Sequence, residues 1–120
     1  MPTKSSDEGS SPAGPLPDVV FHILLALADN ERHGYSVMQE VAALTDGRVR
    51  LSPGTLYGAI QRMLEQGLIE EVRGAKPAAD ERRRFYRITA DGRRAAVAET
   101  ERLRRLLAQA RIAGFAPKRT

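Results

Sequence analysis

The segment Ser52-Pro53-Gly54-Thr55 constrains the fold most strongly, because it fixes where one helix begins. Ser52 can cap that helix, and Pro53 suits the first helical position, where the N–H that proline lacks would have no partner. The apolar spacing that follows predicts a buried stripe of Leu56, Ile60, Met63 and Leu64. Gly67 supplies the stop. The opposite face is slim and polar, and it consists of Thr55, Gly58, Ala59 and Arg62, with Tyr57 beside it.

Two helices are predicted ahead of this one. The first is capped by Asp18 and runs to about Ala28, with an apolar face of Val20, Ile23, Leu24 and Leu27. The second begins near His33-Gly34, and its expected apolar face is Tyr35, Met38, Val41 and Ala42. His33 stands at the start of this helix, either as a cap or as a phosphate contact. Gly47 ends the loop behind it, and Val49-Arg50-Leu51 can form one short strand.

Two strands and a long helix complete the predicted order. The strands span residues 68–73 and 83–88, with Tyr86 and Ile88 on one face. The polar, proline-bearing connector 74–81 is expected to be a hairpin loop, or wing. Thr89 then caps a last helix from about Ala90 to Ala113, with Asp91 favourably placed in its first turn. The predicted fold is mainly α with a small β-hairpin, a winged helix-turn-helix followed by a C-terminal helix.

The last helix is expected to need a second chain. Its apolar seam repeats at spacings of four and three over Ala96, Thr100, Leu103, Leu107 and Ala110. A helix of this extent is about 35 Å long, which is more than so small a core can cover. We therefore predict a homodimer through this seam. The expected organisation is a disordered tail over 1–15, a winged-helix domain over 16–89, a dimerisation helix over 90–114 and a tail over 115–120.

Composition excludes several classes of function. The 120 residues suit one domain, and the absence of Cys excludes disulfides, thiolate chemistry and Cys-based zinc sites. No apolar run reaches the roughly 20 residues that span a bilayer, and the N-terminus does not resemble a signal peptide, so a cytoplasmic protein without a membrane partner is expected. No catalytic pair, metal-ligand spacing or phosphate loop is visible, so we expect no enzymatic activity, metal or cofactor. His22, among apolar neighbours, is interpreted as structural.

Positive charge is concentrated in the last third of the chain. Residues 1–81 carry 7 Lys and Arg against 12 Asp and Glu, whereas residues 82–120 carry 12 against 3. This segment suits a polyanion such as nucleic acid or an anionic membrane, although a solvated helix would have the same charge. Arg82, Arg83 and Arg84 lie at the far end of the predicted wing. A phosphate backbone would relieve their mutual repulsion, while the alternative role is to protect an edge strand.

Three helices followed by a hairpin is the order of a winged helix, in which the third helix is offered to the major groove of duplex DNA. The free N–H groups at its start favour a phosphate, and its outer face carries donors for phosphates and base edges. The alternative for this helix alone is an ordinary capped helix. The predicted DNA contacts are Ser52, Pro53, Thr55, Tyr57, Gly58, Arg62, Lys76, Arg82, Arg83, Arg84, His33 and Tyr35.

The chain resembles the PadR family of bacterial transcription regulators over about residues 16–105. The matching segments are Leu24-Leu25-Ala26-Leu27, His33-Gly34-Tyr35, Ser52-Pro53-Gly54-Thr55-Leu56-Tyr57, Glu65-Gln66-Gly67-Leu68-Ile69-Glu70, and Arg84-Phe85-Tyr86-Arg87-Ile88-Thr89 followed by Gly92. The resemblance implies a homodimer, usually a repressor, that binds an inverted-repeat operator through the third helix and the wing. Ser52, Thr55 and Tyr57 match the family's recognition-helix motif, and Arg84 matches its strand motif.

A single helix after the wing resembles the short branch of the family, in which a C-terminal helix makes the dimer. Some short members bind planar drugs through an aromatic residue on that helix. Here the helix has no aromatic residue before Phe115, and the sequence identifies no small-molecule inducer. The alternatives to a DNA-binding repressor are a winged helix used only for protein interaction and a small hydrolase. Arg82 to Arg84 beside a slim, polar-faced helix favour DNA.

Overall fold

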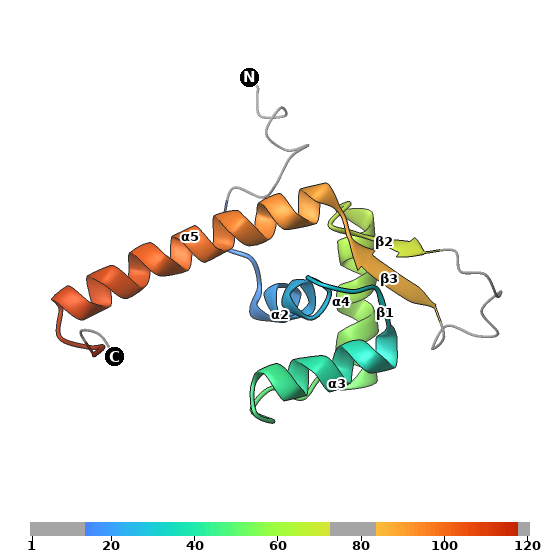
Figure 1. Cartoon of the computed structure of the whole chain (residues 1–120), viewed down its shortest axis with the longest axis horizontal. Coiled ribbons are helices and arrows are strands. Elements are labelled where there is room, and N and C mark those ends of the chain that lie inside the picture. The colour runs from blue at the N-terminus through green and yellow to red at the C-terminus, as the bar shows by residue number, and fades with distance from the viewer. Residues whose placement is uncertain (1–13, 73–83, 118–120) are drawn as a thin grey trace, which may run out of the picture.

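The computed structural model describes residues 14–72 and 84–117, and Figure 1 shows the path of the chain. Its helices and strands, in chain order, are α2 (Asp18–Ala26), β1 (Arg32–His33), α3 (Gly34–Leu44), α4 (Pro53–Glu65), β2 (Ile69–Val72), β3 (Phe85–Ile88) and α5 (Ala90–Ile112). The helices α2, α3 and α4 form a compact group against the sheet, and α5 extends away from it (Figure 1).

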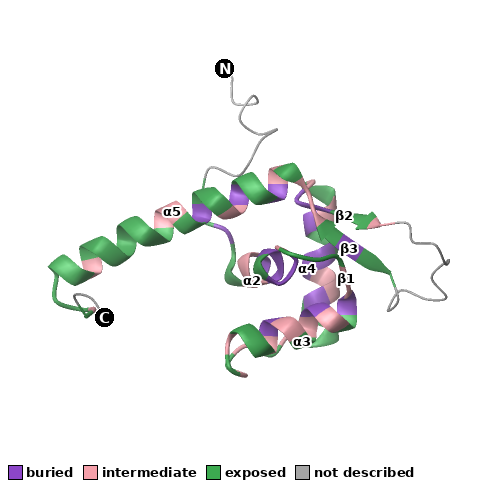
Figure 2. Cartoon of the chain, viewed as in Figure 1, coloured by how far each residue is buried: buried purple, intermediate pink, exposed green. Residues whose placement is uncertain are grey.

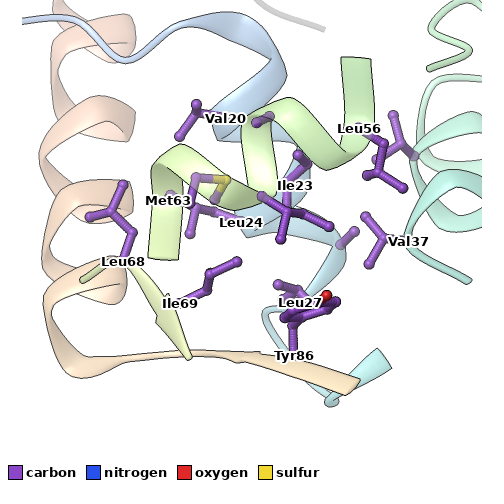
Figure 3. Packing of buried hydrophobic residues seen from close by; sticks show 14 of the residues in the cluster. Val20, Ile23, Leu24, Leu27, Val37, Leu56, Met63, Leu68, Ile69 and Tyr86 are labelled. Atoms are coloured by element: carbon purple, nitrogen blue, oxygen red, sulfur yellow. The ribbon is translucent and has the colours of Figure 1, made fainter. Parts of the chain in front are cut away.

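The core lies where α2, α3 and α4 meet the sheet. Ile23 of α2, Val37 of α3 and Leu56 of α4 have no exposed surface and point toward one another (Figure 3). Ile69 and Tyr86 close the core from the sheet. Burial is therefore confined to one side of each helix, as expected for amphipathic helices around a single apolar centre.

The sheet has three antiparallel strands in the order β1-β3-β2. In the hairpin, Ile69 pairs with Ile88 and Val72 pairs with Phe85. On the other edge of β3, the two residues of β1 pair with Tyr86 and Phe85. Because α3 begins directly after β1, this pairing places the start of α3 next to the wing strands.

The first turn of α5 is fixed against the end of α4 and the start of β2. The Thr89 hydroxyl accepts the Gly92 N–H at 2.9 Å and donates to the Gly67 carbonyl at 2.6 Å, so the predicted cap is confirmed. A Cβ on Gly92 would collide with the Leu68 carbonyl oxygen. The absence of a side chain there allows α5 to approach β2 closely, which sets the direction in which α5 leaves the domain.

Two arginine side chains form hydrogen bonds with backbone carbonyls at the end of α2 and just after it. Arg32 Nε donates to the Ala26 carbonyl at 2.8 Å, and its guanidinium also contacts Ser36 and Glu40 on α3. Arg93 of α5 donates to the Ala28 carbonyl at 2.8 Å. These bonds satisfy carbonyl groups that the end of a helix leaves without intrahelical partners, and they tie α2 to both α3 and α5.

The structure corrects four local predictions. Asp18 does not cap α2: Pro17 occupies the cap position, Asp18 lies in the first turn, and the helix ends at Ala26 rather than Ala28. The third strand is β1 and not Val49-Arg50-Leu51, because β1 occupies the free edge of β3. The last two corrections concern faces: α3 buries Val37 and Val41 and leaves Tyr35 exposed, and α4 buries Ala59, which lies within the stripe between Leu56 and Met63.

Candidate nucleic-acid interface

The start of α4 is built as the sequence predicts. The Ser52 hydroxyl accepts the Thr55 N–H at 3.2 Å and donates to the Thr55 hydroxyl at 3.1 Å, while Pro53 occupies the first helical position. Residues 52–55 are all exposed, and the first turn contains no acidic residue. The partial positive charge of this helix end therefore faces solvent, where a phosphate could bind.

The outer face of α4 is slim because of Gly58. A Cβ at Gly58 would lie 3.7 Å from a terminal nitrogen of Arg62, so the Arg62 guanidinium lies over the glycine one turn earlier. Thr55, Gly58 and Arg62 thus share one accessible surface, as predicted. Ala59 is buried and contributes nothing to this surface, contrary to the sequence analysis.

Tyr57 lies behind the outer face of α4. It is half-buried and packs against the core, and a Cβ at Gly34 would lie 2.8 Å from its ring carbon Cζ. Gly34 is the first residue of α3, so the ring of Tyr57 occupies space that any other residue at this position would fill. The geometry gives Tyr57 a role in holding α4 against α3. A contact between Tyr57 and DNA remains a prediction.

The start of α3 brings two further candidates to the same side as the wing. His33 Nδ1 accepts the Ser36 N–H at 3.1 Å, which makes His33 the cap of α3. The His33 ring also meets Phe85 of β3 edge-on, with ring centroids 5.4 Å apart. Because Nδ1 is an acceptor here, the neutral ring carries its proton on Nε2, which is then available as a donor. Tyr35, one residue into α3, is exposed.

The wing strands carry cations that are already paired. Arg84 Nε lies 3.8 Å from a carboxylate oxygen of Glu71, and Arg87 Nε lies 2.7 Å from Glu70. The hydrogen bond to Glu70 raises the pKa of Arg87 further above its usual value. Arg84 therefore shares its charge with Glu71 before any DNA approaches. The other predicted wing cations, Lys76, Arg82 and Arg83, lie outside the described residues.

Arg48 and Arg50 are candidates that the sequence analysis missed. Both are exposed and directly precede the start of α4. Among residues 14–72 and 84–117, neither has a carboxylate within salt-bridge distance, and the same holds for Arg62. The sequence does indicate them, because two arginines stand at alternate positions just before the helix start. The same alternation is also typical of a short strand, which is why the segment predicts a strand instead.

The predicted dimerisation seam is exposed along the distal half of α5. Leu103 and Leu107 are 40% and 42% exposed, and Leu106, which the prediction did not include, is 49% exposed. Ala96 and Ala110 are half-buried, and the exposed Thr100 donates its hydroxyl to the Ala96 carbonyl. Figure 2 shows that this half of α5 extends beyond the rest of the chain and is largely solvent-facing. The seam is accessible to a partner along its distal leucines.

The described part of the chain lacks the features of two other classes of site. No cluster of three or more His, Asp or Glu residues there could hold a metal ion. None of its helices is long and apolar enough to cross a membrane.

Comparison with known proteins identifies the family. Residues 23–98 match the model of the Transcriptional regulator PadR-like family. The chain belongs to the PadR family. Its relative in Mycobacterium tuberculosis, Transcriptional regulator Rv3488, is 40% identical over 96 residues, which cover 80% of this chain and 84% of that protein. PadR-family proteins are transcriptional regulators and not enzymes, so this chain is a DNA-binding transcriptional regulator.

Solved structures show the same winged-helix fold. A transcriptional regulator from Clostridium thermocellum superimposes with a TM-score of 0.66 at 27% identity, covering 82% of this PadR-family chain and 93% of its own. Bacillus subtilis PadR in complex with operator DNA gives a TM-score of 0.59 at 17% identity, covering 70% of this chain and 47% of its own. The predicted fold class, a mainly helical winged helix-turn-helix with a long C-terminal helix, is confirmed.

Proposed function

We propose that this PadR-family protein is a homodimeric repressor that binds an inverted-repeat operator through α4, the start of α3 and the wing. The observation that carries the proposal is the exposed, slim face of α4 flanked by Arg48, Arg50 and Arg62, which have no acidic partner among the described residues. A helix of this shape fits the major groove, and guanidiniums without carboxylate partners retain their full charge for phosphates.

The contacts divide into two kinds by position. Arg48, Arg50 and the N–H groups at the start of α4 lie where they would hold the phosphate backbone, which fixes register without reading sequence. Thr55 and Arg62 project from the face that would enter the groove, where Arg pairs with guanine and Thr contacts either base type. Tyr57 positions both the phosphate contacts and the base contacts, because its ring packs at Gly34 and so holds α4 against α3.

The dimer follows from the leucines of α5. Burial of one fully exposed Leu side chain contributes about 1.5–3 kcal/mol. Leu103, Leu106 and Leu107 are only partly exposed, so covering each of them would contribute a part of that value to the free energy of association. A second copy related by a two-fold axis covers the seam on both chains and leaves no unpaired end. Two recognition helices held in this way would meet half-sites about one helical turn apart.

Selection of bound sequences from random duplex DNA tests this function. The proposal predicts enrichment of an inverted repeat whose half-sites are centred about 10 base pairs, or a multiple of that, apart. Binding upstream of a reporter promoter should reduce transcription, as expected of a repressor. Enrichment of a single asymmetric half-site would contradict the dimer. Failure to enrich any duplex sequence would contradict operator recognition and favour the winged helix as a protein-interaction module.

A further inference from the structure

Glu99 of α5 is the one charged residue buried in the described part of the chain, with 5% of its surface exposed. Its Oε1 accepts the backbone N–H of Leu16 at 3.1 Å. The same carboxylate receives two bonds from Arg102, from Nε at 3.1 Å and from a terminal nitrogen at 2.6 Å. Leu16 is itself buried in the core, just before α2. Leu16, Glu99 and Arg102, which we call the Glu99 clamp, thus join the entry to α2 to the middle of α5.

Among residues 14–72 and 84–117, the Glu99 clamp is the last attachment of α5 to its own domain. Gly92, Ala95 and Glu99 form the buried side of the helix, Arg102 is half-buried, and residues 103–109 are all exposed. In Figure 1 the segment that enters α2 passes next to the middle of α5, beyond which the helix continues alone. Because a helix is stiff, a small change of angle at this point moves the distal leucines by a larger distance. The close approach at Gly92 sets where α5 starts, and the clamp then controls the angle at which the rest of the helix continues.

A second pair on α5 shows what is special about Glu99. Glu101 receives the same two bonds from Arg104, at the same 3.1 and 2.6 Å. However, the Glu101 side chain is 40% exposed, and it accepts no backbone N–H from any described residue. Exposed pairs of this kind contribute little to stability. A buried carboxylate is costly unless all its partners are in place, so the clamp favours one geometry over its neighbours.

We propose that Glu99 is a positioning residue that fixes the angle between α5 and the winged-helix body, and thereby the half-site spacing that the dimer accepts. Glu99 touches no DNA in this scheme. It acts through the Leu16 N–H and Arg102. The second part of the proposal rests on the proposed homodimer, so the angle and the spacing are tested by separate measurements.

The angle is tested without DNA. Since the chain has no Cys, spin labels can be placed at Gln39→Cys on α3 and Gln109→Cys on distal α5, with unlabelled chains in excess so that only distances within one chain are recorded. Wild type and the matched control Glu101→Ala should give one narrow distance distribution. Glu99→Ala should give a shifted or markedly broader one. The same narrow distribution in Glu99→Ala would overturn the proposal, whatever the protein binds.

Two milder variants keep this test decisive if Glu99→Ala fails to fold, which a thermal melt would reveal. Glu99→Gln keeps an acceptor for the Leu16 N–H and loses the ion pair, and Arg102→Met keeps the carboxylate and loses its bridge. Each of these two variants should broaden the distance distribution, but less than Glu99→Ala does. An unchanged distribution in both variants would also overturn the proposal.

The spacing is tested on operators in which the gap between half-sites is altered. One base pair moves a half-site by about 3.4 Å and rotates it by about 35°. For wild type and Glu101→Ala, a change of one base pair should reduce affinity about tenfold, as a mismatched pair would. For Glu99→Ala the same change of one base pair should reduce affinity only about threefold, which corresponds to half the binding free energy of a tenfold reduction.

The two possible failures are distinguishable. Equal spacing selectivity in Glu99→Ala and wild type, with both proteins dimeric, would overturn the link between the clamp and operator spacing. A wild-type protein that is monomeric, or that binds no inverted repeat, would instead contradict the proposed function. In that case the label distances still decide whether Glu99 sets the angle of α5.

Discussion

Arg48, Arg50 and Arg62 differ from the other arginines of residues 14–72 and 84–117, because their side chains make no ion pair or hydrogen bond with another described residue. Arg84, by contrast, shares its charge with Glu71. A guanidinium that must leave a carboxylate to reach a phosphate gains less from DNA than one that is free to bind. At the residue scale, we therefore propose that Arg48 and Arg50, which precede α4, bind phosphates ahead of Arg84.

Replacing Arg50 by Ala should weaken binding to all duplex sequences to the same extent. The log–log slope of affinity against salt should become shallower by about 0.9 if one phosphate contact is lost. Arg104→Ala, which removes an exposed and paired arginine on distal α5, is the matched control and should leave the slope unchanged. Titrations at several salt concentrations measure the slope. Equal slopes for wild type and Arg50→Ala would remove Arg50 from the interface.

Acid should weaken the attachment of Leu16 to α5. The bonds from Arg102 and then from the Leu16 N–H hold the pKa of Glu99 below its ordinary value of 4.5. A carboxyl group whose pKa is lower in the folded state contributes stability above its unfolded pKa and loses it as the pH falls through the folded value. Urea unfolding measured from about pH 6 down to about pH 3, a range that spans the ordinary pKa of Glu, tests this. The free energy of unfolding should fall less steeply with acid in Glu99→Gln than in wild type.

Salt separates this effect from that of Glu101, whose pKa is also lowered, mainly by its hydrogen bond to Arg104. The difference between Glu101→Gln and wild type should shrink at high salt, because that pair is exposed to solvent. The difference for Glu99→Gln should persist. Identical pH profiles for wild type and Glu99→Gln at every salt concentration would show that the buried carboxylate has no such role.

At the scale of elements, the approach of α5 to β2 depends on a missing side chain. In Gly92→Ala the new Cβ would meet the Leu68 carbonyl oxygen, a backbone atom that cannot turn aside, and also Ile88. We expect a loss of about 1–3 kcal/mol in the free energy of unfolding, as for other overpacked sites. Gly54→Ala, where nothing lies within 4 Å of a Cβ, should change stability by less than about 0.5 kcal/mol. Equal urea midpoints for the two variants would contradict this packing.

Local signals predicted the elements that are determined locally. Ser52 and Thr89 cap α4 and α5 as expected, because each cap uses an N–H only three residues away. Pairing between distant segments was not predictable in the same way. The two residues of β1 are too short to show a pattern, and they become a strand only because β3, more than fifty residues later, offers them an edge. The buried face of α3 was misassigned for a related reason, since contact with α2 and α4 selects Val37 over Tyr35.

The site was predictable to a similar extent. The slim face of α4 follows from Gly58 and the spacing of its neighbours. The half-buried position of Tyr57 depends on Gly34, which is far away in the sequence. The pairing of Arg84 with Glu71 depends on the register of the hairpin. Charge and helix start alone could not separate free from paired arginines.

At the scale of the whole molecule, α5 projects from a small core and carries an apolar surface that no other described part of the chain covers. Replacing Leu103 and Leu107 together by Asp would bury two charges at the proposed seam, which is strongly unfavourable. We expect monomers that have lost tight operator binding while α4 and the wing strands remain folded. Val97→Asp is the control, because Val97 is 68% exposed and lies on α5 away from the seam. A dimeric double variant would place the interface elsewhere.

If two chains act together on one operator, sedimentation of the wild-type protein with and without DNA will show it. We expect a dimer at tens of micromolar and two chains on each inverted-repeat duplex, bound much more weakly when one half-site is scrambled. A monomer at that concentration, which still binds the inverted repeat tightly as a single chain, would contradict this expectation.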